Sequence, residues 1–225
     1  MVLTTVVLDL DDTLIASARA RVRAYKSLRS FGIDPGEAEA INNLWWPRYY
    51  RGECSLEELR LGRWVDLGLD PERAAEVDEL YRRHHHHIRS RHGARHMLEE
   101  LSRSGVRLIL LSNAGIDYVR ERVAALRVDA LFHGIIDAAE RSWKPHPDAF
   151  NGALEMVGAS PAEAAMVGDN LEADIEGALS AGFGHAVWLS RRKAHPDPRV
   201  FTCTSLRAAT CHLLPLARGR AGGTT

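Results

Sequence analysis

Two aspartates separated by one residue directly follow an apolar run near the start of the chain, which reads Val6-Val7-Leu8-Asp9-Leu10-Asp11. Because the side chains of a β-strand alternate between its two faces, Asp9 and Asp11 begin on the same side of the chain. An aspartate at the end of a strand can attack phosphorus or carbon, or it can bind a hard cation. An isolated pair of this kind indicates no more than a polar turn, so its meaning depends on companion residues.

Short apolar runs alternate with amphipathic stretches along most of the chain. The expected strands are residues 6–10, 106–111, 135–137, 165–167 and 186–189, and the expected helices are residues 94–104, 116–126, 147–157 and 171–181. Gly105 and Gly182 stand where a helix end favours a left-handed residue. Strands that alternate with helices form a parallel sheet that is covered on both faces. The pattern therefore predicts an α/β fold.

One segment interrupts this alternation. From about residue 16 to residue 92 the pattern is helical, with turns at 32–36, 52 and 68–71. We expect residues 16–92 to form an inserted helical domain, and residues 1–15 and 93–215 to form the core. A last helix is expected at 205–214, followed by a disordered tail at 216–225 that is rich in Gly, Arg and Thr.

Polar residues recur immediately after the later strands. Ser112-Asn113 follows the second strand, Lys144-Pro145 the third, and Gly168-Asp169-Asn170 the fourth, with Asp174 in the helix beyond. Ligands in parallel sheets bind at the carboxyl ends of the strands. Each cluster alone is a weak signal, but four clusters at one sheet edge together predict a catalytic or binding site.

The composition argues against several kinds of partner. The chain has 29 basic and 30 acidic residues and a net charge of −1, so we expect no nucleic acid and no anionic membrane as partner. The apolar runs are too short for a transmembrane helix, and the first strand begins too early to leave room for a signal peptide. The three cysteines lack metal-site spacing. We expect a cytoplasmic protein with free thiols that is a monomer or a homodimer.

These motifs resemble those of the haloacid dehalogenase-like hydrolase superfamily, from residue 6 to about residue 189. The resemblance is carried by Asp9-Leu10-Asp11-Asp12-Thr13-Leu14, Leu111-Ser112-Asn113, Lys144-Pro145 with Pro147 and Phe150, and Val167-Gly168-Asp169-Asn170 with Asp174 and residues 177–182. It implies a Rossmann-like parallel sheet core, and the inserted helices stand where this family has its α-helical cap. Trp143 and His146 depart from the family pattern, at positions that carry no chemistry in it.

The resemblance also implies a metal ion. Several carboxylates and a phosphate monoester would repel one another strongly without cations. In the family, Mg²⁺ would be held by the carboxylates of Asp9 and Asp169 and by the backbone carbonyl of Asp11. Asp174 would hold metal-bound water or Lys144. Oxygen ligands of this kind suit Mg²⁺.

The two acids of the first motif have different implied roles. Asp9 would attack phosphorus in line and form an aspartyl-phosphate intermediate. Asp11 would donate a proton to the leaving oxygen and then activate the hydrolytic water. Dehalogenases of the family usually lack an aspartate at the position of Asp11, so the resemblance favours phosphoryl chemistry.

Four further residues would bind or support the phosphoryl group. Ser112 and the backbone of Asn113 would bind its oxygens, and Lys144 would offset the negative charge on it and on Asp9. Thr13 is assigned to the same phosphate site, where it would bond locally and fix the loop that carries both acids. All of these roles are implied by the resemblance.

We therefore expect a Mg²⁺-dependent phosphatase that acts on a small phosphorylated metabolite, such as a sugar phosphate or a nucleotide. A phosphomutase of the same superfamily remains an alternative, because it shares every core motif. A non-enzymatic phospho-acceptor, such as a response-regulator receiver, also uses clustered aspartates, Mg²⁺ and a late lysine. The long insertion and the Gly168-Asp169…Asp174 motif argue against that alternative.

Two other clusters lie in the insertion. Four adjacent histidines at 84–87 would point around the whole circumference of a helix, so we expect a solvated surface there and no metal site. The aromatic run at 45–51 is compatible with packing and with a wall that faces the substrate. Trp45–Tyr49 and Trp46–Tyr50 have i,i+4 spacing, so we expect one pair inside the cap and the other facing the substrate. Trp45, Trp46 and Arg48 are the candidates for substrate specificity.

Overall fold

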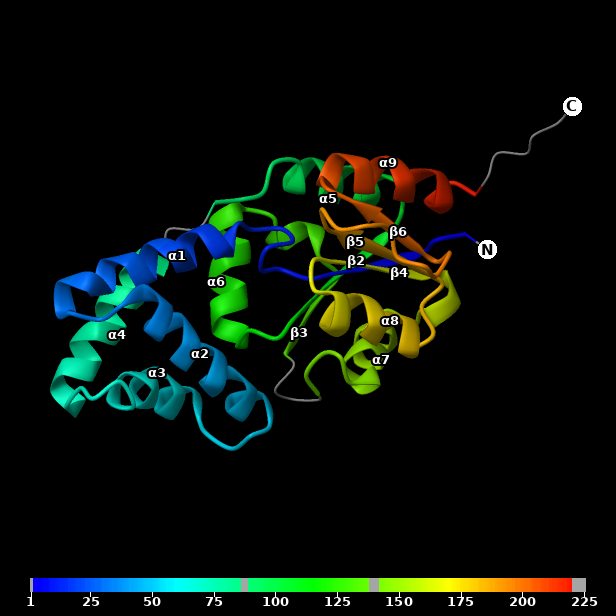
Figure 1. Cartoon of the computed structure of the whole chain (residues 1–225). Helices are drawn as coiled ribbons and strands as arrows, with labels where there is room; N and C mark the ends of the chain where they lie inside the picture. The colour runs from blue at the N-terminus through cyan, green and yellow to red at the C-terminus, as the bar shows by residue number, and fades with distance from the viewer. Residues whose placement is uncertain (1, 86–88, 138–141, 220–225) are drawn as a thin grey trace, which may run out of the picture. The chain divides into compact units, whose positions relative to one another are not determined.

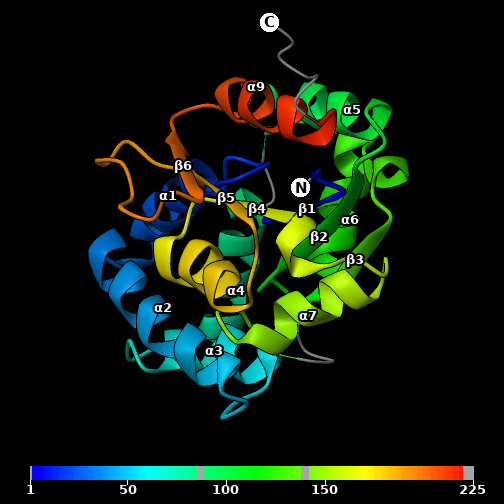
Figure 2. The same ribbon diagram turned by 90° about the vertical axis from the view of Figure 1, so that its right-hand side faces the viewer.

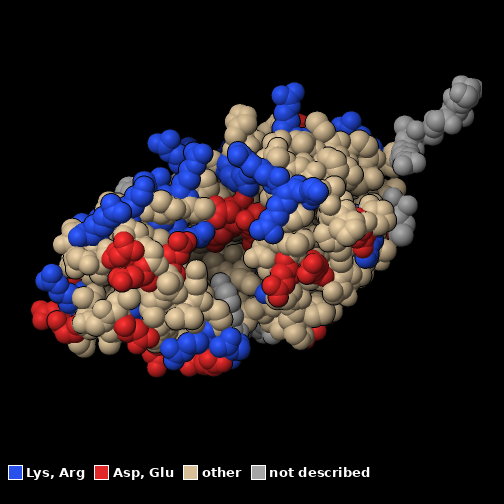
Figure 3. All heavy atoms as spheres, viewed as in Figure 1, with Lys and Arg blue, Asp and Glu red and all other residues tan. Residues whose placement is uncertain are grey.

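The chain forms two compact units in the computed structural model, which describes residues 2–85, 89–137 and 142–219 (Figure 1). The core consists of Met1–Ile15 and Ser90–Thr225, and the insertion consists of Ala16–Arg89. The insertion thus ends slightly before residue 92, the boundary expected from the sequence. Figure 3 shows basic and acidic side chains mixed over the visible face of each unit, in keeping with the net charge of −1.

The core is built on a six-stranded sheet in the order β3-β2-β1-β4-β5-β6. Its strands are β1 (Thr5–Leu8), β2 (Arg107–Ser112), β3 (Gly134–Asp137), β4 (Ala164–Gly168), β5 (His185–Leu189) and β6 (Val200–Cys203). All neighbouring strands are parallel. The predicted Rossmann-like α/β fold is therefore confirmed. β6 was not predicted from the sequence.

The position of β1 in the sheet determines where a ligand can bind. Leu8, the last residue of β1, lies opposite Leu110 of β2 and Val167 of β4. The chain leaves β1 toward β2 and β3 on one side and later returns to β4 on the other, so the strand order reverses between β1 and β4. Ligands of open parallel sheets bind at the carboxyl ends of the strands at such a reversal. Asp9 and Asp169 directly follow these two strands.

Helices cover both faces of the core sheet (Figures 1 and 2). α5 (Ala94–Arg103) and α9 (Leu206–Ala217) pack together on one face, while α7 (Pro147–Glu155) and α8 (Gly177–Ser180) lie on the other. α6 (Ile116–Leu126) follows β2. Apolar residues from the sheet and α7, such as Ile109, Met166 and Phe150, form one buried cluster. None of the helices in the described ranges has the length and apolar character needed to span a bilayer.

Three features of the core differ from the expected elements. The helix expected at 171–181 is divided into a π-helical segment, Leu171–Glu176 (η5), and the short helix α8. α9 continues to Ala217, so the disorder expected from residue 216 is wrong for its first residues, and 220–225 lie outside the described residues. β6 adds a strand in a segment that the sequence pattern left irregular. Gly105 and Gly182 adopt the expected left-handed conformation, with φ of 78° and 85°.

The insertion is entirely helical in its described residues, as predicted. It contains α1 (Ser17–Ser27), α2 (Pro35–Tyr50), α3 (Leu56–Val65) and α4 (Pro71–His85). Asp34 caps α2, and Ser55 with Glu58 forms a capping box at the start of α3. Apolar and aromatic side chains from these helices, among them Trp64 and Tyr81, form its buried core.

His84 and His85, the described part of the histidine run, lie at the end of α4. His85 stacks on Tyr81 with ring centroids 5.5 Å apart, and His86 and His87 lie outside the described residues. Within the described ranges, the acidic group Asp9, Asp169 and Asp174 is the one set of three or more potential metal ligands that comes together.

Candidate active site

The position of Asp9, which directly follows β1, is fixed by the pairing of β1 with β4. Its backbone N–H donates to the carbonyl of Val167 at 3.0 Å, which extends the contact between β1 and β4 by one residue. The loop then reverses, and the carbonyl of Leu10 accepts from the backbone N–H groups of Thr13, Leu14 and Ile15. Asp12 makes this reversal with a φ of 58°, a conformation that Asp tolerates better than most residues. Asp9 is 7% exposed.

Lys144 joins two of the acids. Its ammonium nitrogen Nζ lies 2.7 Å from Asp9 Oδ1 and 2.6 Å from Asp174 Oδ1, and the side chain is buried. Asn113 fixes the backbone of Lys144 through two hydrogen bonds of 2.8 Å. In one, Asn113 Nδ2 donates to the Lys144 carbonyl, and in the other the Lys144 N–H donates to Asn113 Oδ1. The Asn113 side chain is therefore a support for Lys144, a role that the sequence did not suggest.

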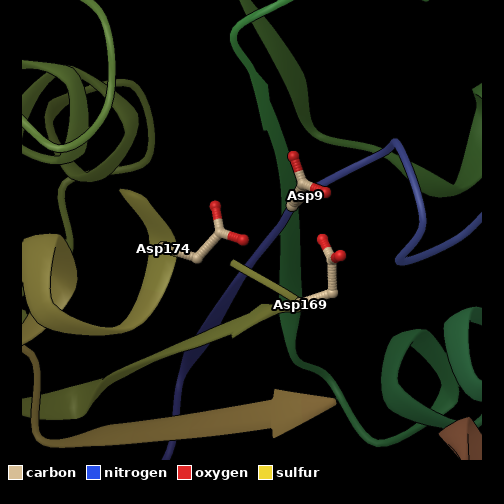
Figure 4. A group of neighbouring side chains, drawn as sticks. All are labelled: Asp9, Asp169 and Asp174. Carbon is tan, nitrogen blue, oxygen red and sulfur yellow. The ribbon is translucent and has the colours of Figure 1, made fainter. Parts of the chain in front are cut away.

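The carboxylates of Asp9, Asp169 and Asp174 point toward one another (Figure 4). One oxygen from each lies within 4.8 Å of the others. The Asn170 N–H donates to Asp174 Oδ2 at 3.0 Å, so η5 holds this carboxylate against the end of β4. A Cβ atom on Gly168 would come within 2.2 Å of Asp174 Oδ2. The glycine of the Gly168-Asp169 motif is therefore needed to make room for the third acid.

The charges of these groups are unbalanced. Burial raises the pKa of Asp9 to about 8, with Lys144 opposing the shift and Asp174 adding to it. Burial, together with Asp174 and Asp12, raises the pKa of Asp169 to about 6. Burial alone would lower the pKa of Lys144, but Asp174 and Asp9 raise it above its ordinary value, so the ammonium stays charged. One lysine does not compensate three clustered carboxylates, two of which are buried, and the site favours a further cation.

The remaining predicted core residues lie in the same part of the core. Ser112 is buried at the end of β2, and its Oγ accepts from the Ala114 N–H at 3.1 Å. Thr13 is also buried, but its hydroxyl has no hydrogen-bond partner among the described residues, so the expected local hydrogen bond is not formed. His146 caps α7 by accepting from the Asp148 N–H, as befits a loop histidine.

Trp188 was not predicted to belong to this region. It lies on β5, and its indole Nε1–H donates to the backbone carbonyl of Asp169 at 3.0 Å. Trp188 also lines a groove of about 610 Å³ beside Asp169, together with polar residues such as Ser190 and Arg192. A single aromatic residue in a core strand gives no local signal for such a contact, because the contact depends on the pairing of β4 with β5.

The three specificity candidates lie in the insertion. Trp45 is buried, its Nε1–H donates to Asp66 Oδ2 at 2.9 Å, and a Cβ atom on Gly62 would come within 2.2 Å of its ring. Trp45 therefore belongs to the interior of the insertion. The guanidinium of Arg48 lies 4.1 Å from the centroid of the Trp45 ring. Trp46 is half-buried and packs edge-on against Tyr49, at 5.7 Å between ring centroids. The Tyr50 side chain lies outside the described residues.

The fold and the site together define a Rossmann-like α/β enzyme whose acidic groups and one lysine meet at the strand-order reversal. The protein-family model for haloacid dehalogenase-like hydrolases matches residues 3–182. The chain belongs to this family, and the predicted family and hydrolase class are confirmed.

Characterised relatives extend over most of the chain. It is 31% identical to N-acylneuraminate-9-phosphatase of Rattus norvegicus, covering 84% of this chain and 83% of the relative. It is also 31% identical to phosphoserine phosphatase of Thermus thermophilus, covering 86% and 91%. The crystal structure of the HAD-hydrolase YfnB from Bacillus subtilis, bound to magnesium, has a similar fold. Its TM-score is 0.78 at 20% identity, covering 95% of this chain and 99% of that one.

Proposed function

We propose that this protein is a Mg²⁺-dependent phosphatase that hydrolyses a small phosphate monoester through an aspartyl-phosphate on Asp9. The observation that carries the proposal is the group of three carboxylates, two of which bond to one buried lysine. The two phosphatase relatives support the reaction class, and their names refer to small phosphorylated molecules. Among such molecules, we favour a sugar phosphate or a nucleotide as the substrate.

The donor set fits a magnesium ion. The carboxylate oxygens of Asp9 and Asp169 and the backbone carbonyl of Asp11 are hard oxygen donors, and Asp174 lies within reach of the same space. The raised pKa values of Asp9 and Asp169 support this fit, because burial disfavours negative charge there unless a positive charge is added. When bound, Mg²⁺ would neutralise charge on the carboxylates and on the phosphoryl group.

In the proposed reaction, a carboxylate oxygen of Asp9 forms a bond to phosphorus while the ester oxygen leaves. Asp11 gives a proton to that leaving oxygen. It then takes a proton from water as the water attacks the aspartyl-phosphate, so that phosphate is released and both aspartates return to their starting states. Ser112 and the Asn113 backbone would bind the phosphoryl oxygens, with Thr13 in the same segment as Asp11. Lys144 stabilises negative charge on Asp9 throughout.

Each unit, taken by itself, contains candidate residues for recognition of the rest of the substrate. In the core, the groove beside Asp169 is lined by Ser190 and Arg192 among others. In the insertion, Trp46 and Arg48 are the candidates for contact with the substrate. Trp45 is buried, so we propose that it supports Arg48 from inside the insertion rather than contacting the substrate. The free thiols of Cys54, Cys203 and Cys211 suit a reducing compartment, so we place the protein in the cytoplasm, as a monomer or a homodimer.

A phosphate-release screen across phosphorylated metabolites, with Mg²⁺ present, tests the proposed function. Wild-type protein should release phosphate from at least one small monoester, and the Asp9→Asn variant should release none. Analysis of the organic product separates hydrolysis from isomerisation, because a phosphomutase would return an isomer and little free phosphate. Failure of the wild-type protein to hydrolyse any monoester, in a preparation shown to be folded, would contradict the proposal.

A further inference from the structure

Tyr118 connects α6 to the loop that carries the proposed acid–base residue. Its hydroxyl donates to Asp11 Oδ1 at 3.1 Å, and both residues belong to the core. α6 begins shortly after Ser112, so the helix that follows the proposed phosphate-binding segment also reaches Asp11. No role for Tyr118 follows from the sequence motifs.

The hydroxyl of Tyr118 remains a hydrogen-bond donor at neutral pH. The pKa of a tyrosine phenol is ordinarily about 10, so the hydroxyl keeps its proton through the neutral range. A phenol that keeps its proton does not relay one. Its hydrogen bond instead favours negative charge on Oδ1 of Asp11 and limits rotation of that carboxyl group.

Arg122 holds the ring of Tyr118 in place. It lies one helical turn further along α6, and the carbon at the centre of its guanidinium lies 4.6 Å from the centroid of the Tyr118 ring. The Arg122 side chain is buried, and its Nη1 lies 3.2 Å from Glu121 Oε1. Its Nε and Nη2 have no hydrogen-bond partner among the described residues. Stacking on Tyr118 is therefore a main contact of this buried cation, and the two side chains restrain each other.

We propose that Tyr118 is a positioning residue for the reaction, and that it holds Oδ1 of Asp11 so that Oδ2 is the oxygen that exchanges protons with the leaving group and with water. A carboxyl that accepts a hydrogen bond on one oxygen carries its own proton on the other. Tyr118 would thus determine that Oδ2 of Asp11 carries the transferred proton, and in which direction from the carboxyl group this proton points. This inference rests on the proposed phosphatase function and adds a residue to it.

The test is a kinetic cycle on two esters of similar shape, phenyl phosphate and p-nitrophenyl phosphate, with saturating Mg²⁺. The phenolate leaving group needs a proton, while the more acidic nitrophenolate leaves largely without one. Tyr118→Phe should lower kcat for phenyl phosphate by about tenfold and kcat for p-nitrophenyl phosphate by less than about threefold, with little change in KM. In the Asp11→Asn background, measured in single turnover, Tyr118→Phe should have no further effect, because its effect acts through Asp11.

Two further variants separate positioning from stability. Val119→Ala shortens a buried apolar neighbour on α6 whose side chain cannot hydrogen-bond to Asp11, so it should lower the melting temperature while changing kcat for both esters by the same factor. Arg122→Met keeps the Tyr118 hydroxyl and removes the stacked cation. It should reproduce the substrate-dependent loss in weaker form, and it carries the test if Tyr118→Phe does not fold.

The outcomes are distinct. An equal loss on both esters, or an undiminished loss in the Asp11→Asn background, would overturn the role of Tyr118 while leaving the phosphatase function standing. A Tyr118→Phe enzyme with unchanged kcat on both esters would likewise overturn the role of Tyr118 and leave the phosphatase function standing. A wild-type protein that hydrolyses neither ester nor any metabolite would overturn the phosphatase function, and this inference with it.

Discussion

Replacing Asp9 by Asn should stabilise the metal-free protein at neutral pH while abolishing turnover. The Asp9 carboxyl is buried beside Asp174, and Lys144 bonds to both. Burial, partly opposed by Lys144, raises the pKa of Asp9 from 3.8 to about 8. The metal-free fold therefore favours a neutral group at this position, and asparagine supplies one of nearly the same size.

The size of the effect follows from the difference in pKa between the folded and unfolded states. A carboxyl whose pKa is raised on folding stabilises the fold while it is protonated. That contribution is complete below the unfolded value of 3.8 and is lost as the pH rises through about 8. At about 1.4 kcal/mol per pKa unit, the wild-type protein should lose about 4 kcal/mol more stability than Asp9→Asn between about pH 5 and about pH 8.

Urea denaturation of both proteins in EDTA, at several pH values, measures this difference in the free energy of unfolding. Asp129→Asn, which removes one exposed carboxylate from the core, is the matched control. Adding Mg²⁺ should stabilise the wild-type protein, by about 2.7 kcal/mol at a hundred times its Kd, and should stabilise Asp9→Asn less. If the variant instead loses stability relative to the wild type as the pH rises, the Asp9–Lys144 ion pair outweighs burial and the reasoning is wrong.

Four further predictions concern the metal, the proton donor and, in two cases, the insertion. Activity should vanish in EDTA and return with Mg²⁺, while Ca²⁺ should inhibit because of its looser, higher coordination; full activity in chelator would exclude a metal role. Asp11→Asn should slow turnover on the order of 10²–10⁴-fold for poor leaving groups and less for p-nitrophenyl phosphate, as steady-state kinetics on both would show. Trp45→Ala should destabilise the insertion by about 3–5 kcal/mol in a denaturation experiment. Trp46→Ala should instead cost about 1–3 kcal/mol in kcat/KM for the best substrate of the screen, and equal losses on a small aryl phosphate would argue against that role.

The sequence predicted the main elements of the core because their signals are local. The helix expected at 116–126 coincides with α6, where an apolar pattern begins after Gly115. Most of the candidate site residues were identified because they come after strands, and the ends of parallel strands meet at one edge of the sheet. This reasoning predicts from the sequence alone that Asp9 and Asp169 lie close together.

Features that depend on contacts between distant segments were missed. β6 has four residues, too few to show a period, and its pairing with β5 is a tertiary contact. The π-helical turn of η5 does not alter the apolar pattern that predicted a single helix. Such turns are frequent at functional sites, and this one carries Asp174.

Contacts between side chains far apart in the sequence could not be predicted either. Asn113 reaches Lys144, and Tyr118 reaches Asp11, across loops that no local rule constrains. The burial of Trp45 had one available signal, Gly62 in the next helix, because only a glycine leaves room for the indole. A glycine inside a helical pattern is too common a feature to identify its aromatic partner.

The most direct test of the central claim is to trap the covalent intermediate on Asp9. The Asp11→Asn variant should slow hydrolysis of the aspartyl-phosphate, so acid quenching during turnover of a phosphate-labelled substrate should give labelled protein. Peptide mapping should then place the label on Asp9, and the label should be released as free phosphate on further incubation. A label on another residue, or phosphate release by this variant with no labelled protein at any time, would contradict the account.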